Sequence, residues 1–159
     1  CPRTSSAGRW FDAAAGLLGV SSVMNYEGQA AMQLEAMAAR HGGVMLEPGL
    51  WRLDGGVLDL LPLAERLIDE RDAAAGAALF HSTLAAAMAD WIALAARRQK
   101  LTTVALGGGC LLNRVLATQL SALLRARGLT VLTAVQAPPN DGGIALGQAW
   151  VARRRLLEI

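Results

Sequence analysis

Three consecutive glycines, here called the glycine triplet (residues 107–109), form the motif best suited to bind an anion. They follow an apolar run, and Asn113 stands where the next helix is expected to begin. Exposed backbone N–H groups in such a turn, together with the positive end of a helix, favour phosphate. A tight strand-to-helix turn without a ligand would have the same sequence features. The loop is neither a Walker loop, which needs Gly-Lys-Ser/Thr, nor a dinucleotide fingerprint, which needs glycine at Leu112.

A second glycine-containing loop, from Pro138 to Gly143, carries one carboxylate. Its sequence is Pro-Pro-Asn-Asp-Gly-Gly, and Asp141 lies just ahead of the last expected helix. This aspartate is either the N-cap of that helix or a functional group. If both glycine loops follow adjacent parallel strands, Asp141 faces the same crevice as the glycine triplet. A carboxylate beside a bound phosphate normally acts through a divalent metal ion.

A helix expected near the N-terminus has one unusually smooth face. Gly8, Asp12 and Gly16 recur at spacings of four, so they lie on one side of a helix over residues 7–18. Residues 4–6 offer hydroxyl groups that can cap the start of this helix. A single carboxylate between two positions without side chains admits a ligand close to the backbone.

The histidines and cysteines favour structural roles. His41 and His81 lie far apart in sequence and lack a metal-binding spacing such as HxxxH. Cys110 precedes a helix start, but no base can be assigned to it, which favours a small packing residue over a nucleophile. Cys1 and Cys110 form no CxxC pair, so neither a zinc site nor a disulfide framework is indicated, and a reducing cytoplasm is expected.

The elements that would position these residues alternate between strand and helix in the second half of the chain. A buried strand is expected over residues 101–106 and another strand over 129–135, each followed by a glycine loop and a helix. This order predicts an α/β fold with two parallel strands and helices packed over them. A short hairpin through Asp54-Gly55-Gly56 precedes them. Helices are expected over residues 7–18, 29–40, 61–69, 73–97, 113–127 and 144–157.

The composition is that of one folding unit with a sizeable core. The 159 residues are 53% hydrophobic and 18% charged, with mean hydropathy +0.34 and a formal net charge of +2. The basic clusters Arg97–Lys100 and Arg153–Arg155 fall at expected helix C-termini, where cations complement the helix dipole. No aromatic residues interleave with them, so nucleic acid is not an expected partner.

The most apolar stretch, residues 73–96, is expected to be a buried helix of a soluble protein. His81, Thr83 and Asp90 interrupt it, whereas a membrane-spanning helix needs an unbroken apolar run. No membrane contact is therefore expected. Because the first residue is Cys1 and no signal peptide is recognisable, we expect the chain to begin inside a longer polypeptide.

Five segments together resemble the HypF carbamoyltransferase family in order and spacing. The sharpest are TSSAGRWFD at residues 4–12, YEGQAA at 26–31 and PPNDGGIALGQA at 138–149. Phe80-His81 and the run from 107 to 113 complete a match that spans nearly the whole chain. The resemblance implies the C-terminal subdomain of an ASKHA fold (actin, sugar kinase and heat-shock ATPase; ribonuclease H-like). Within that fold, the resemblance implies the branch to which TsaD and the antibiotic O-carbamoyltransferases also belong.

The resemblance also implies an activity. In this family an upstream domain makes carbamoyl adenylate from carbamoyl phosphate and ATP. The domain resembled here then passes the carbamoyl group to the C-terminal cysteine of HypE, a step in making the cyanide ligands of [NiFe]-hydrogenases. ATP or carbamoyl adenylate is the implied nucleotide, with a divalent metal ion (iron, zinc or magnesium), and HypE is the implied partner. No catalytic residue is assigned.

Site roles carry over from the family to matching residues only. The ribose side of the nucleotide would be formed by Gly8, Asp12, Gly28 and Glu35 or Gln33. Asp12 would contact the ribose itself, and the two glycines would make room. The phosphate side would be formed by Gly107, Gly108, Gly109 and Asn113. Asp141 would be a metal ligand.

Several parts of the family pattern precede this segment and are absent from the sequence. They are the HxxxH metal ligands, the adenylate-forming domain, the zinc-finger cysteines and an acylphosphatase-like domain. We therefore expect residues 1–159 to be the C-terminal portion of a carbamoyltransferase domain, inactive alone. Two alternatives stay open. One is a TsaD-like or O-carbamoyltransferase fragment, which YEGQAA and PPNDGG disfavour, and the other is a non-catalytic nucleotide-binding or interaction module.

Overall fold

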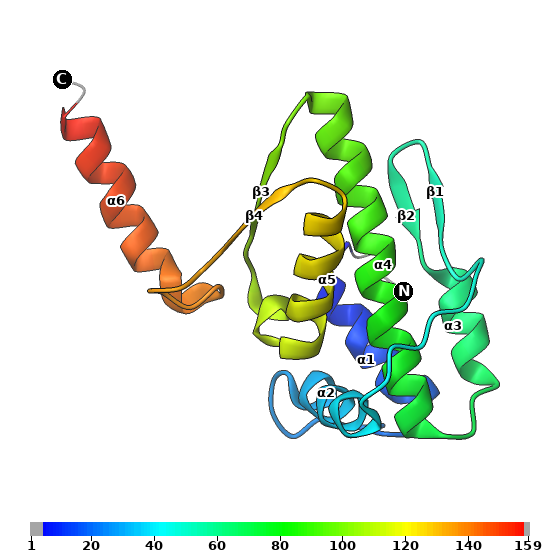
Figure 1. Ribbon diagram of the computed structural model, residues 1–159. Helices are drawn as coiled ribbons and strands as arrows, with labels where there is room; N and C mark the ends of the chain where they lie inside the picture. The colour runs from blue at the N-terminus through cyan, green and yellow to red at the C-terminus, as the bar shows by residue number, and fades with distance from the viewer. Residues whose placement is uncertain (1–4, 158–159) are drawn as a thin grey trace.

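A long central helix organises the fold (Figure 1). The computed structural model describes residues 5–157, so Cys1 and the expected capping residue Thr4 lie outside the described residues. The central helix, α4, spans Ala73–Gln99 and begins at Asp72, whose side chain accepts hydrogen bonds from the N–H groups of the first turn. Every residue from 76 to 87 is buried, and many are alanines, so neighbouring helices approach α4 closely on several sides.

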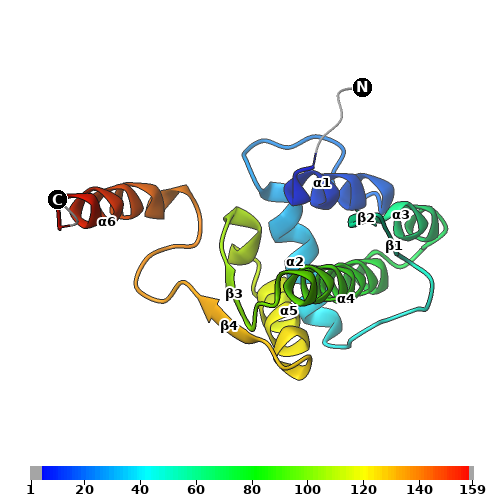
Figure 2. The same ribbon diagram turned by 90° about the horizontal axis from the view of Figure 1, so that it is seen from above.

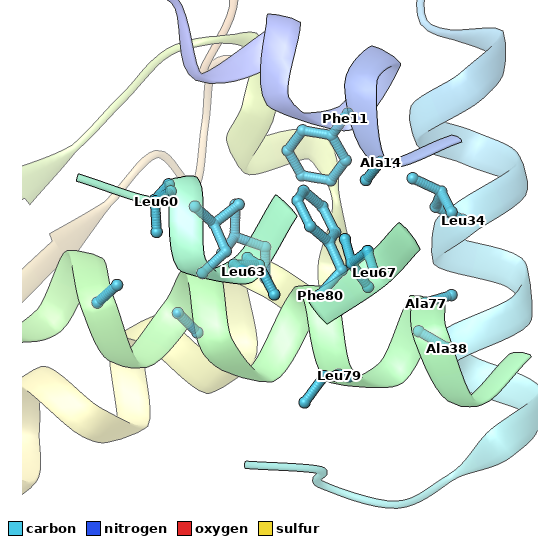
Figure 3. Packing of buried hydrophobic residues seen from close by; sticks show 14 of the residues in the cluster. Phe11, Ala14, Leu34, Ala38, Leu60, Leu63, Leu67, Ala77, Leu79 and Phe80 are labelled. Atoms are coloured by element: carbon cyan, nitrogen blue, oxygen red, sulfur yellow. The ribbon is translucent and has the colours of Figure 1, made fainter. Parts of the chain in front are cut away.

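Four helices pack around α4 and form one hydrophobic core. They are α1 (Ala7–Leu17), α2 (Gln29–His41), α3 (Leu61–Ile68) and α5 (Arg114–Ala126). The rings of Phe11 and Phe80 meet edge to face, with centroids 5.0 Å apart (Figure 3). Leucines of the surrounding helices fill the space about these rings. The helices predicted over these segments are confirmed, with ends that agree within two residues.

The predicted hairpin is also confirmed. Strands β1 (Arg52–Asp54) and β2 (Val57–Asp59) are antiparallel, with Leu53 opposite Leu58. Gly55 and Gly56 both have positive φ, 57° and 89°, as the tight turn between twisted strands requires. The indole Nε1 of Trp91 donates a 2.7 Å hydrogen bond to the carbonyl of Gly56, which ties the hairpin tip to α4.

The predicted pair of parallel strands is present, but its first strand is less buried than expected. Strand β3 (Thr103–Leu106) pairs in parallel with β4 (Thr130–Thr133), and α5 is the crossover between them. In β3, Val104 and Leu106 are half-buried, whereas Thr103 and Ala105 are exposed. The expectation of a buried strand is therefore wrong. A sheet of two strands has only one face covered by the helices, so alternate side chains reach the surface.

The C-terminal arm is defined as residues 134–157, and its helix stands apart from the rest of the protein, which we call the helical body (Figures 1 and 2). It contains the short 3-10 helix η2 (Asp141–Gly143) and helix α6 (Ile144–Leu157). All residues of α6 are exposed, including Trp150 at 57%. The sequence predicted that this helix packs over the strands, and that part of the prediction is wrong. No described residue of the helical body covers its apolar side chains.

Candidate functional site

The smooth face of α1 lies against the loop that follows β3. A Cβ atom built on Gly8 would lie 3.9 Å from Sγ of Cys110, which belongs to the 3-10 helix η1 (Gly109–Leu112). Gly16 is exposed and has nothing within 4 Å of such an atom. The close approach expected of this face is therefore found at its N-terminal end only.

Asp12 presents an acceptor without a hydrogen bond at this approach. Its Oδ2 atom is buried and accepts no hydrogen bond, although Nη2 of Arg9 lies 2.9 Å away as an ion pair. The side chain of Asp12 is 23% exposed, so one part of the carboxylate remains open to solvent. A buried acceptor of this kind is costly unless a donor reaches it, and hydroxyl groups of a ligand are suitable donors.

Cys110 shows no sign of activation as a nucleophile. Burial raises the pKa of its thiol, and the opposing effect of Arg9 is smaller. A raised pKa keeps the sulfur protonated at neutral pH, whereas a nucleophilic cysteine needs a thiolate. The interpretation of Cys110 as a packing residue is consistent with its half-buried place between η1 and α1.

The glycine triplet forms an exposed turn whose backbone requires glycine. Gly108 has φ 105° and ψ 158°, a conformation that side chains disfavour, and all three glycines are exposed. The N–H of Gly108 donates a 2.6 Å hydrogen bond to the carbonyl of Pro139. This bond joins the two glycine loops at the carboxyl ends of β3 and β4, so the strand arrangement on which the shared crevice depended is present.

The second loop is capped by Asn140 and not by Asp141. Oδ1 of Asn140 accepts a 3.2 Å hydrogen bond from the N–H of Gly142, and Asp141 is exposed. The N-cap interpretation of Asp141 is therefore wrong, since Asn140, one position earlier, occupies the cap position and its side-chain oxygen already accepts from the turn. A Cβ atom on Gly143 would lie 2.8 Å from the carbonyl oxygen of Pro138, so no larger residue fits there.

Among the residues that the structure describes, no three His, Cys, Asp or Glu side chains are grouped as a metal site would need. Asp141 is a single exposed carboxylate. The described residues therefore do not form a metal site by themselves. The role of Asp141 as a metal ligand stays a prediction that requires ligands from elsewhere.

The start of α5 gathers two predicted site residues from distant parts of the chain. Asn113 caps the helix, with Oδ1 accepting from the N–H of Leu116 at 2.9 Å. Oε1 of Glu35, on α2, accepts from the N–H of Arg114 at 2.7 Å. A carboxylate at a helix N-terminus also complements the helix dipole. Sequence spacing could not have placed Glu35 here, because 79 residues separate the two partners.

Asn113 makes a second hydrogen bond, to a buried histidine. Nδ2 of Asn113 donates to Nε2 of His81 at 2.9 Å, and Nδ1 of His81 lies 2.7 Å from the carbonyl oxygen of Ala77. His81 is fully buried and Asn113 is 6% exposed. The structural role expected for His81 is found, but its link to a site residue was missed. The paired motifs Phe80-His81 and 107–113 were the only signal that could have suggested it.

Gly28 caps the start of α2 and Gln33 lies within it, and the structure explains the two residue types differently. Gly28 is the N-cap of α2 with φ 79°, and nothing lies within 4 Å of an added Cβ atom. Glycine is thus explained by the backbone angle at Gly28, and not by a close approach within the chain. Oε1 of Gln33 is buried without a hydrogen-bond partner among the described residues. Gln33 therefore resembles Asp12 in offering a buried acceptor.

A hollow opens beside the carboxyl ends of the two parallel strands. It has a volume of about 450 Å³ and lies between the strand ends and one face of α5. Its lining includes Leu106 and Thr133, which end the strands, with Ser121 and Arg125 from α5 and Pro139 from the second loop. Ligands of open α/β sheets bind at this edge.

Comparison with known proteins assigns the family. The model of the second subdomain of the Kae1-like carbamoyltransferase domain matches residues 1–148. The chain belongs to the HypF carbamoyltransferase family. Carbamoyltransferase HypF2 of Cupriavidus necator is 51% identical over 97% of this chain, and HypF of Rhizobium leguminosarum is 48% identical over 98%. The predicted resemblance to HypF is thus confirmed.

Solved structures of HypF proteins confirm the α/β fold of the ASKHA type. A full-length HypF crystallised in a phosphate- and nucleotide-bound form matches with a TM-score of 0.82 and 34% identity over 96% of this chain. HypF of T. kodakarensis matches with the same TM-score and 28% identity over 97%. The chain spans about a fifth of these proteins: 22% and 20% of the two curated relatives, and 21% and 20% of the two crystal structures.

Helix α4 is long and apolar enough to cross a membrane by length and composition alone. Within its most apolar window, however, 67% of the residues are buried inside the fold. The helix lies at the centre of a domain that resembles HypF structures. This agrees with the expectation of a buried core helix.

Proposed function

We propose that this chain is the nucleotide-binding part of a carbamoyltransferase that moves a carbamoyl group from carbamoyl adenylate to the C-terminal cysteine of HypE. In this proposal the reaction is a step in the synthesis of the cyanide ligands of [NiFe]-hydrogenases, and it takes place in the cytoplasm. Family membership supports the carbamoyl-transfer chemistry. Because the chain spans only about a fifth of HypF2, the intact protein supplies the remaining parts of the reaction.

The observation that carries the proposal is the buried Oδ2 of Asp12, which is ion-paired with Arg9 but accepts no hydrogen bond, beside Gly8 and the loop after β3. Ribose hydroxyls are donors that this acceptor can bind, and Gly8 leaves the backbone of α1 open for them. Asp12 therefore binds the ribose in this proposal. Phosphate groups bind the glycine triplet through backbone N–H groups other than that of Gly108, which is bonded to Pro139, where the positive end of α5 lies after η1.

A divalent metal ion, bound through Asp141 and ligands outside these residues, belongs to the same proposal. When bound, such an ion polarises the carbamoyl carbonyl or a phosphate oxygen. The residues of this chain orient the nucleotide, and Gly108 holds the two loops together through its bond to Pro139. Cys110 takes no part as a nucleophile, because burial raises the pKa of its thiol.

The test is the affinity of the intact protein for adenine nucleotides. Asp12→Asn keeps the size of the side chain and removes its charge, and we expect ATP to bind about tenfold more weakly, which corresponds to about 1.4 kcal/mol. Isothermal titration calorimetry with ATP measures this change when the data are fitted to two sites, because the adenylate-forming domain expected upstream also binds ATP. The far-UV circular dichroism spectrum should stay unchanged, because asparagine has the same shape as Asp12 and is accommodated at the same place on α1.

Asp90→Asn is the matched control. Asp90 forms an ion pair with Arg127, as Asp12 does with Arg9, but it lies beside Leu129 at the opposite end of β4. The control should bind ATP as the unaltered protein does. Equal weakening in both variants, or no binding of ATP by the unaltered protein at millimolar concentration, would contradict the proposed nucleotide site.

A further inference from the structure

His81 occupies a fully buried position from which it reaches the predicted phosphate side of the site. Its ring packs edge to face against Phe11 of α1 and Phe80 of α4, with centroid distances of 5.6 and 5.5 Å. The ring is fixed by these contacts and by its hydrogen bond to Ala77. A histidine held this rigidly presents its second nitrogen, Nε2, in one direction only, toward Asn113.

The hydrogen bonds determine the tautomer of His81. The carbonyl of Ala77 can only accept, so Nδ1 of His81 carries the proton and donates to it. In the neutral ring Nε2 is then an acceptor, and it receives Nδ2 of Asn113. The N–H of Leu116 can only donate, so Oδ1 of Asn113 must face it. Both bonds therefore demand the same orientation of the Asn113 amide.

Asn113 connects this bond to the rest of the site. Its backbone N–H donates to the carbonyl of Cys110 at 3.3 Å and closes η1, which follows the glycine triplet. Its neighbour Arg114 donates to Glu35. The amide orientation of Asn113 thus fixes where α5 begins, and with it the direction of the N–H groups after the loop.

We propose that His81 is a positioning residue, which holds the Asn113 amide in the orientation that caps α5 and so keeps the glycine loop in its nucleotide-binding geometry. The inference rests on the proposed function. His81 itself is buried and touches no ligand. A protonated ring would turn Nε2 into a donor facing the NH2 group of Asn113, so the amide would have to rotate and give up its bond to Leu116.

Acid should therefore release the cap. Burial lowers the pKa of His81 below its ordinary value of 6.5, and the bond to Ala77 and the charge of Glu35 only partly oppose this. Glu35 on α2 is the charged group that faces His81, while α1 and α4 present Phe11 and Phe80, and α5 presents Asn113. The ring is therefore neutral at pH 7, and its protonation requires a pH below the ordinary range of a histidine.

Two substitutions in the intact protein separate positioning from simple packing. His81→Gln keeps an acceptor oxygen near the place of Nε2, whereas His81→Leu has similar size and no acceptor. Both lose the bond to Ala77, so both are expected to lower stability. Only His81→Leu should weaken ATP binding, by about tenfold, as the loss of one well-placed hydrogen bond implies. His81→Gln should stay within about threefold of the unaltered protein.

Hydrogen exchange gives a second readout that does not depend on a nucleotide. Amide exchange of the peptide over residues 113–118, followed by mass spectrometry at pH 7, should be faster in His81→Leu than in His81→Gln. Ser82→Ala is the control, because Ser82 is an equally buried neighbour whose hydroxyl accepts from the N–H of Met45, away from α5. It should leave both ATP affinity and exchange at α5 unchanged.

The outcomes distinguish the two ideas. If the unaltered protein binds no ATP, the proposed nucleotide site is overturned, and the exchange experiment alone decides whether His81 positions Asn113. Equal exchange at α5 in the glutamine and leucine variants of His81 would overturn the positioning role. Equal loss of ATP affinity in both variants would also overturn it, because packing would then explain the whole effect.

Discussion

The helical body and the C-terminal arm have similar sequence patterns but different surroundings. Both α5 and α6 follow a parallel strand and a glycine loop, and an asparagine caps the turn that begins each of them. In the body, Leu116, Leu120 and Leu124 of α5 are completely buried. In the arm, every residue of α6 is exposed. The comparison teaches that apolar residues specify a helix locally, whereas burial depends on what surrounds it.

The largest difference in stability is expected between alanine substitutions of two aromatic residues, one in the helical body and one in the arm. Phe80→Ala should lower the free energy of unfolding by about 3–5 kcal/mol, because it leaves a cavity between Phe11 and His81. Trp150→Ala removes a larger side chain from α6 but should change stability by less than about 0.5 kcal/mol, since Trp150 is 57% exposed. Urea unfolding of the 159-residue chain measures both. Equal destabilisation would show that α6 is packed in solution.

The two capping asparagines make the next comparison. Asn113→Ala should cost about 1–2 kcal/mol, because it removes the cap of α5 and leaves Nε2 of buried His81 without a donor. Asn140→Ala removes an exposed bond to Gly142 and should cost less than about 0.5 kcal/mol. Thermal unfolding of both variants tests this. Asn113→Ala should also weaken ATP binding in the intact protein. A loss of stability in Asn140→Ala but not in Asn113→Ala would contradict this prediction.

The pH dependence of stability should come from the body. Because the pKa of His81 is lowered by burial, the unfolded chain takes up a proton near pH 6.5 that the folded chain does not. The contribution of His81 to the free energy of unfolding should therefore be fully present above pH 6.5 and should be lost progressively as the pH falls below it. His81→Gln should flatten this slope between pH 7.5 and 5.5.

A change in the arm at Asp141 should affect activity and hardly affect stability. Asp141→Asn keeps the shape of an exposed residue whose neighbour Asn140 makes the cap, so stability should change by less than about 1 kcal/mol. In the intact protein the same change should abolish carbamoyl transfer, because a proposed metal ligand is lost. Full activity with unaltered metal content would contradict the role of Asp141.

The sequence predicted the elements well because each carries its own local signals. Asp72 before an alanine-rich run, Gly128 after α5 and Gly55-Gly56 in the hairpin specify starts, stops and turns within a few residues. The parallel pairing of β3 with β4 followed from the order of strand, helix and strand. The half-exposed β3 could not be predicted, because an apolar run does not reveal how many strands lie beside it.

The candidate site was predicted as a set of residues but not as a set of contacts. Gly8 and the loop after β3 do come together, and so do Glu35 and Asn113. Glu35 or Gln33 was expected near the sugar, and that role stays a prediction, whereas the hydrogen bond of Glu35 to the N–H of Arg114 was not foreseen. Such contacts between distant segments depend on the packing of α2 against α4 and α5, which no spacing within one helix encodes.

The burial of α4 has a consequence for the order in which the chain is made. Helix α4 contacts α2 and α3, which are synthesised before it, and α5, which is synthesised after it. While the ribosome is still making α5, one side of an apolar segment long enough to cross a membrane is uncovered. His81, Thr83 and Asp90 within that segment make insertion into a bilayer unfavourable. His81 and Thr83, which the finished core must accommodate, and the half-buried Asp90 thus disfavour membrane insertion of the nascent chain until α5 covers it.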